Sequence, residues 1–268
     1  MKFRAGYEFN YHFPDRTPVL LMLNVHYNRV SDLSAPDNII LSPSVPITGY
    51  RDSYGNWCSR IVAPPGLMRI CADTIVRDSG ARDWQPAQAQ QIPVEELPED
   101  AILFLLASRF CDSDQMLDLA WSLFGTHVPG LPRVIEICNF VHRHIEFGYH
   151  HASVTRTASQ AYHDRKGVCR DYAHLAISFC RALNIPARYC TGYLSDVGTP
   201  LPYPPGDFAA WFEAYLGGQW ITFDPRNNEP RIGRFLIARG RDAADVPMVM
   251  TFGVNTLKSF RVWTDEVA

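Results

Sequence analysis

The chain has 268 residues, of which 47% are hydrophobic and 20% are charged, and its formal net charge is −3. This length is enough for one large or two small domains with a buried core, and the nearly balanced charge argues against nucleic acid as a partner. No window approaches the ~18 uninterrupted apolar residues of a membrane span, so no membrane partner is expected. The first residues lack the apolar stretch of a secretory signal, which favours a cytoplasmic location.

Residues 1–80 have the pattern of a β-domain. The runs 18–25 and 67–76 are short and rich in β-branched residues, and turn-forming clusters at 53–56 and 63–66 bound them. No segment here keeps a helical period. We therefore predict an N-terminal antiparallel β-sandwich over residues 1–80, followed by a polar connector over residues 81–100.

The period changes after residue 100. Ser113 can cap one helix, Pro132 can begin a second, and a third runs from about Val168 to Leu183. Strands follow at 187–194, 208–215 and 220–223, with further strands at 246–254 and 258–264. The prediction is an α+β fold, in which residues 101–268 form a core of helices packed on an antiparallel sheet.

Seven cysteines occur without any Cys-x-x-Cys spacing, which argues against a disulfide framework and against a zinc site. Most are expected to be small buried hydrophobic residues. Cys169 differs, because it lies in the first turn of the third predicted helix, close behind Gly167 and flanked by Arg165, Lys166 and Arg170. A helix N-terminus and positive charge both favour a thiolate. The alternative is an ordinary half-buried cysteine in a first turn.

A predicted hairpin over residues 207–224 suggests where a base for this thiol would lie. If Gly217 and Gly218 are the turn residues, Asp224 faces Trp211, and position 209 is its diagonal neighbour on the same face. A histidine at 209 would then be oriented by Asp224, as nucleophilic catalysis requires. Position 209 is alanine.

Three motifs carry a resemblance to a known family: GVCRDYAHL at 167–175, DFAAWFE at 207–213 and TFDPR at 222–226. Together they closely resemble the bacterial transglutaminase-like cysteine peptidase family, and the segments 107–110 and 238–246 look like flanking family segments. The resemblance implies a papain-like core behind an N-terminal β-sandwich. It makes Cys169 the nucleophile and Asp224 the third member of a triad, and the family's histidine falls on Ala209. It implies no metal or organic cofactor.

Ala209 has three competing interpretations. It is an inactivating substitution that keeps a substrate from turning over, or the mark of a natural pseudoenzyme, or a sign that another histidine serves as base. His174 lies about 140° around the helix from Cys169 and is expected to point away. The remaining candidates are histidines in predicted loop before that helix; they are His150, His151 and His163. Without an imidazolium, the pKa of Cys169 is expected near the free value of about 8.5.

The predicted activity of the parent enzyme is hydrolysis of a peptide or amide substrate, and this chain is expected to be an inactivated variant because of Ala209. Cys169 attacks the carbonyl, the residue at 209 (histidine in the family) is the base, and Asp224 orients it; water then releases the thioester. Trp211 is expected either to wall the cleft or to be a core aromatic residue. The Cys169 N–H is expected to serve the oxyanion hole, and Gln160 and Tyr149 are the candidates for the second donor. The alternatives are acyl transfer to an amine on the same thioester and a non-catalytic peptide-binding protein. The oligomeric state is left open.

Overall fold

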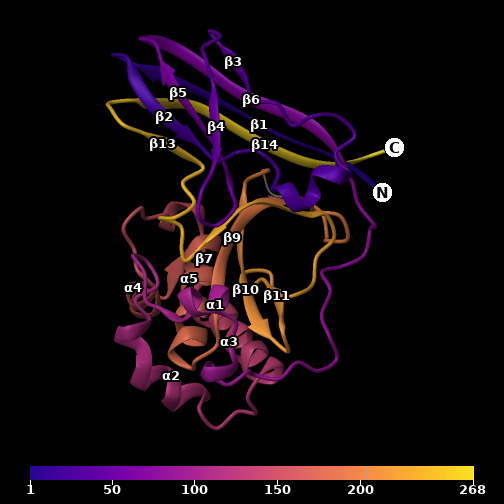
Figure 1. The fold of residues 1–268 in the computed structure, drawn as a ribbon, viewed down its shortest axis with the longest axis vertical. Helices are drawn as coiled ribbons and strands as arrows, with labels where there is room; N and C mark the ends of the chain where they lie inside the picture. Colours follow the sequence, from indigo (N-terminus) through magenta and orange to yellow (C-terminus); the bar gives the residue numbers. More distant parts are fainter. Residues whose placement is uncertain (204) are drawn as a thin grey trace.

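The computed structural model describes residues 1–203 and 205–268, and it joins a β-sandwich to a mixed core of helices and antiparallel sheet (Figure 1). The sandwich consists of two antiparallel sheets, with strand orders β14-β1-β6-β3 and β13-β2-β5-β4. Its strands are β1 (Lys2–Phe13), β2 (Thr17–Leu21), β3 (Ile40–Ser42), β4 (Thr48–Arg51), β5 (Trp57–Ala63), β6 (Gly66–Arg77), β13 (Val249–Thr251) and β14 (Thr256–Val267). The predicted fold class is confirmed.

The two C-terminal strands belong to the sandwich and not to the core. Strand β14 runs antiparallel to β1 from Lys2↔Val267 to His12↔Thr256, and β13 pairs with β2. The predicted core of residues 101–268 is therefore too long at its C-terminal end. The alternating pattern of these strands was correctly interpreted, but the partner of a strand is not encoded in its own period.

The core packs five α-helices around a four-stranded antiparallel sheet of order β11-β10-β9-β12. Its strands are β9 (Ala187–Leu194), β10 (Ala209–Leu216), β11 (Gln219–Phe223) and β12 (Arg234–Gly240), with a small parallel pair of β7 (Glu146–Phe147) and β8 (Lys166–Gly167). The α-helices are α1 (Glu99–Ile102), α2 (Leu117–Phe124), α3 (Leu131–His144), α4 (Ala158–Asp164) and α5 (Cys169–Ala182). Short 3₁₀ helices are η1 (Tyr27–Asp32), η2 (Val94–Glu96), η3 (Leu103–Leu105), η4 (Ser113–Met116) and η5 (Tyr149–His151).

Helix α5 is the centre of the core. Every residue from Asp171 to Ala182 is buried, and the helix packs on β10 and β9 as well as on α3 and α4. The helix is buried although it carries polar and charged side chains, among them Asp171, His174 and Arg181, and it begins and ends within one residue of the predicted bounds. Within the described part of the chain, no helix is both long and apolar enough to pass through a membrane.

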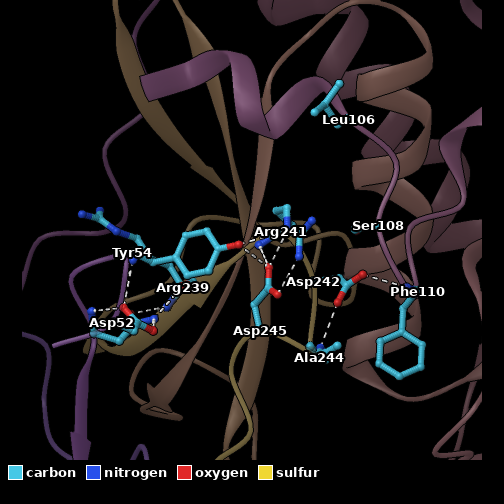
Figure 2. A network of polar contacts seen from close by, with 12 residues as sticks. Asp52, Tyr54, Leu106, Ser108, Phe110, Arg239, Arg241, Asp242, Ala244 and Asp245 are labelled. Atoms are coloured by element: carbon cyan, nitrogen blue, oxygen red, sulfur yellow. Dashed lines mark hydrogen bonds and ion pairs between the residues drawn. The ribbon is translucent and has the colours of Figure 1, made fainter. Parts of the chain in front are cut away.

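The sandwich and the core are joined through the loop between β4 and β5 (Figure 2). The Tyr54 hydroxyl donates to Asp245 at 2.8 Å and accepts from Arg241 at 3.0 Å. Asn56, which is fully buried, exchanges two hydrogen bonds of 2.8 and 2.9 Å with the backbone of Arg239. Buried polar groups that are fully paired in this way fix one relative placement of the two parts.

The two flanking segments that resemble the family meet at the same junction. The Phe110 N–H donates to Asp242 at 2.7 Å, which ties residues 107–110 to residues 238–246 (Figure 2). Arg181, buried at the end of α5, donates to the carbonyls of Leu106 and Arg241 and so binds both segments to the central helix.

Candidate active site

Cys169 is the first residue of α5, and its place is fixed by the motif around it. The Asp171 carboxylate accepts from the Val168 N–H at 2.8 Å and so caps the helix start. A Cβ atom at Gly167 would lie 2.6 Å from that carboxylate, so only glycine leaves room for the cap. The spacing of Gly167, Cys169 and Asp171 thus fixes the position of the Cys169 thiol at the start of the helix.

The Asp171 side chain is completely buried. Its carboxylate pairs with Arg156 at 3.2 Å, and burial raises its pKa. Arg156 also donates to the carbonyl of His151 at 2.7 Å. The same ion pair therefore holds η5 beside the start of α5, and η5 supplies Tyr149 to the site.

The predicted hairpin register is observed. Gly217 and Gly218 both have positive φ, at 57° and 83°, and the ladder runs from Leu216↔Gln219 to Phe212↔Phe223. Asp224 follows the last paired residue of β11, one step beyond the ladder. Ala209 begins β10 and lies opposite Gly192 of β9.

Cys169 and Ala209 line one cleft. Its other described lining residues come from β7, from η5, from the 194–210 segment and from the loop after β11. They are Phe147, Tyr149, Leu194, Asp196, Pro205, Gly206, Asp207, Phe208, Ala210, Arg226, Asn227 and Arg231. The backbone N–H groups of Ala210 and Arg170 lie where they stabilise a thiolate on Cys169. Strand β11 ends before it reaches Ala210, which leaves that peptide group open to the cleft.

The thiol is nevertheless held in its protonated form. The pKa of Cys169 is raised to about 12, mainly by burial. The charges of Asp207 and Asp224 also raise it, whereas the N–H groups of Ala210 and Arg170 lower it. The expected pKa near 8.5 is therefore too low. Arg165 and Lys166, which the sequence placed beside the thiol, are exposed and do not offset the two carboxylates.

Asp224 is buried, and its partners are already in place. Its carboxylate accepts from Arg234 at 2.9 Å, from the Asn227 N–H at 3.0 Å and from the Asn227 side chain at 2.8 Å. The Arg234 guanidinium also pairs with Asp83 at 3.0 Å and lies over the ring of Trp211, 4.7 Å from its centroid. The cation beside Asp224 is thus an arginine, where the family pattern has an imidazole.

Trp211 does not wall the cleft. It is 2% exposed and packs with Cys190, Leu236 and Ala209 on the sheet face that lies away from α5. Residue 209 shares this face with it, as the alternation of β10 predicts, but the described lining of the cleft does not include Trp211.

No histidine is found among the described residues that line the cleft. His174 is fully buried, stacks on Phe110 with a centroid distance of 5.4 Å, and accepts from the Ala243 N–H at 3.2 Å. Burial lowers its pKa to about 3, so it is a neutral core residue, as expected. His150 and His151 lie on η5 and His163 near the end of α4, outside the lining.

The two candidates for the second oxyanion donor separate. Gln160 is exposed, its side-chain oxygen accepts from the Thr157 N–H at 3.0 Å in a capping box on α4, and it is not among the described residues that line the cleft. Tyr149 lines the cleft, and burial together with the nearby Asp207 and Cys169 raises its pKa, so its hydroxyl stays a donor. In the described residues no group of side chains could hold a metal ion, and all seven cysteines are free thiols.

Comparison with known proteins assigns the family. The sequence profile of the Transglutaminase-like superfamily matches residues 120–225, which include Cys169, Ala209 and Asp224. A solved protein from Cytophaga hutchinsonii, provisionally named a cysteine protease, is 30% identical with a TM-score of 0.84, over 98% of this chain and 90% of that one. This chain belongs to the transglutaminase-like superfamily.

Its relatives among sequences include proteins without a described activity. An uncharacterised protein of Mycobacterium leprae is 37% identical over 92 residues, which is 32% of this chain and 32% of that protein. An uncharacterised protein of Mycobacterium tuberculosis is 28% identical over 227 residues, 74% of this chain and 69% of that one. The chain thus aligns with only about a third of the M. leprae protein. The family match and the C. hutchinsonii structure support a cysteine-type enzyme, and the substrate and the reaction are left to be proposed.

Sequence reasoning missed several residues that share the cleft with the thiol. Asp196, Arg226 and Arg231 come from loops and were not singled out. Asp207 is the first residue of the DFAAWFE motif and lies two residues before the start of β10. The signal in the sequence that could have identified Asp207 was a carboxylate two residues before the expected base position 209.

Proposed function

We propose that this protein is a cysteine hydrolase of peptide or amide bonds, in which Cys169 forms a thioester with the acyl part of the substrate. The observation that carries the proposal is the position of Cys169: it begins a buried helix, opens into a cleft and faces the backbone N–H of Ala210. A peptide N–H at the sulfur and Tyr149 beside it supply donors for the oxyanion that forms when the thiol attacks a carbonyl.

A non-catalytic peptide-binding protein is the second candidate. It is favoured by the pairing of Asp224 with Arg234 and by the raised pKa of Cys169, since both run against an active Cys-His-Asp triad. The Asp83–Arg234–Asp224 network also bears on the origin of Ala209. In this network Arg234 provides a cation for Asp224. We therefore favour the interpretation that Ala209 is a natural part of this site over the interpretation that it is an inactivating substitution of a histidine.

A cleavage assay separates these functions. The protein and its Cys169→Ala variant are incubated with a mixed peptide library, with and without an added primary amine, and the products are identified by mass spectrometry. New peptide termini that need Cys169 support hydrolysis. Amine adducts that need Cys169 support acyl transfer, the other chemistry open to a thioester. Peptides that are retained unchanged by both forms support a binding protein, and in that case the proposed hydrolase is wrong.

A further inference from the structure

We propose that the Asp207 carboxylate is the group that takes up and returns the proton of the Cys169 thiol, in the role that the family pattern gives to a histidine at 209. The inference rests on the proposed function, because it names the base of the same site. It assigns a catalytic role to a residue outside the three expected triad positions.

The position of Asp207 suits this role. One residue, Phe208, separates it from β10, and it lines the cleft together with Cys169 and Tyr149. It also lines the neighbouring depression, which it shares with Asp196 and with residues 262–266 of β14. Asp207 therefore lies where the cleft that holds the thiol joins a second opening to solvent, and a base there can reach both the thiol and an incoming water molecule.

Asp207 is also free to exchange a proton, whereas Asp224 is not. Its Oδ1 accepts from the adjacent Phe208 N–H at 2.7 Å, and among the described residues no lysine, arginine or histidine forms an ion pair with it. Asp224 has three donors on its two oxygens. The other charged or titratable groups of the cleft are Tyr149 from η5, Cys169 from α5, Asp196 after β9, and Arg226 and Arg231 after β11.

The electrostatics agree with this geometry. Of the charges that raise the pKa of Cys169, Asp207 is the largest, and it is also the largest of those that raise the pKa of Tyr149. Burial raises the pKa of Asp207 itself above its ordinary value. A carboxylate with a raised pKa is a better proton acceptor than an exposed one. Because the pKa of Cys169 is also raised, the thiol stays protonated until a substrate carbonyl binds.

The reaction then balances without another partner. As the sulfur forms its bond to the carbonyl carbon, its proton passes to Asp207 and the carbonyl π electrons move to oxygen. The tetrahedral intermediate collapses, the C–N bond breaks, and the leaving amine takes the proton from Asp207. In the second half Asp207 accepts a proton from water as the new C–O bond forms, and the departing sulfur takes that proton back when the C–S bond breaks.

The test uses the intact protein, p-nitrophenyl acetate as acyl donor and three variants: Asp207→Asn, Asp207→Glu and, as a matched control, Asp118→Asn on the exposed side of α2. Two rates are measured for each, the hydrolysis of the acetyl thioester on Cys169, by intact mass, and the alkylation of Cys169 by iodoacetamide at constant pH. Thermal unfolding checks that each variant folds, and Asp207→Ser replaces Asp207→Asn if that variant does not.

The two rates should move in opposite directions. Asp207→Asn removes a negative charge beside the thiol, so alkylation should become faster, by roughly tenfold for each unit that the pKa falls. Thioester hydrolysis should slow by roughly 10²-fold or more, because the base is lost. Asp207→Glu should recover part of the hydrolysis, and Asp118→Asn should match the unaltered protein. A residue that only supports the fold would slow both rates or neither.

The proposal is overturned if Asp207→Asn hydrolyses the thioester at the unaltered rate, if its alkylation is not faster, or if p-nitrophenyl acetate fails to acylate Cys169 in the unaltered protein. Its failure is distinguishable from that of the proposed function. Peptide cleavage that needs Cys169 but not Asp207 keeps the hydrolase and rejects the base, whereas thioester hydrolysis that needs Asp207 without peptide cleavage keeps the base and rejects the peptidase.

Discussion

The cation beside Asp224 is the guanidinium of Arg234 and not the imidazole expected at position 209. We expect this difference to change the chemistry open to Cys169. An imidazole at 209 would shuttle a proton, whereas Arg234 stays charged and gives Asp224 a permanent partner. Ala209 and its cross-strand neighbour Gly192 carry little side chain on this part of the sheet, where Arg234 crosses to Trp211 and Asp224. The motif spacing predicted Cys169 and Asp224 as site residues. The Arg234 contact depends on β12, which pairs with β9 and not with β11, so no local sequence pattern predicted it.

The protonated thiol predicts a steep pH dependence of labelling. Because the pKa of Cys169 is raised to about 12, the thiolate fraction should rise about tenfold per pH unit through the whole range from neutral pH to about pH 11. The measurement is the second-order rate of iodoacetamide alkylation at Cys169, read by peptide mass spectrometry. A rate that is already constant from about pH 6 would show that another group ionises this thiol.

Position 209 allows a direct test of the exchange. Ala209→His alone should increase labelling of Cys169 near pH 6 only weakly, because Arg234 keeps Asp224 occupied and repels an imidazolium. Ala209→His combined with Arg234→Gln should increase it by at least about tenfold over the single variant, since Asp224 can then orient the new imidazole. Arg234→Gln alone is the control. Equal labelling by the single and double variants would show that Arg234 does not compete for Asp224.

At the scale of elements, the local signals were the reliable ones. The Gly217-Gly218 turn fixed the hairpin register, and the helical period fixed α5, because both are set by residues close in the chain. Ser113, expected to cap an α-helix, instead begins the 3₁₀ helix η4, which leads into α2. Element ends of this kind depend on what packs against them, here α5 and α4.

The cap of α5 should be sensitive to one methyl group. Gly167→Ala would place a Cβ within 2.6–2.9 Å of the Asp171 carboxyl atoms, so either the cap at Val168 or the pair with Arg156 must give way. We expect the free energy of unfolding to fall by about 1–3 kcal/mol and alkylation of Cys169 to change with it. Urea unfolding measures the first, with Lys166→Ala, an exposed neighbour, as the control. An unchanged unfolding midpoint would mean that the helix start tolerates a shift.

At the scale of the molecule, the junction shown in Figure 2 joins the sandwich to the core through residues that lie far apart in the sequence. Tyr54 comes from the sandwich, whereas Arg241 and Asp245 come from the segment after β12. Sequence indicated that both segments matter but not that they touch, since contacts of such long separation leave no periodic signal. The same limit explains why the C-terminal strands were assigned to the wrong part.

The Tyr54 hydroxyl predicts how this junction responds to alkaline pH. Burial and the hydrogen bond to Asp245 raise its pKa to about 12. A raised pKa means that the neutral phenol is favoured in the folded state, so its contribution to stability is complete below about pH 10 and is lost as the pH rises towards 12. Unfolding by urea at pH 9, 10 and 11 should therefore show a smaller loss of stability for Tyr54→Phe than for the unaltered protein. Parallel curves would contradict the assignment.

The pairing of β14 with β1 has a consequence for synthesis on the ribosome. Strand β1 is made before the core, yet its partner on one side, β14, is made only after the whole core has been translated. Until β14 is made, one edge of β1 has no partner strand. The core, whose four sheet strands are all made before β14, can fold earlier. Although domains usually fold in the order in which they are made, here the sandwich, whose first strands are made before the core, would complete its sheet after the core.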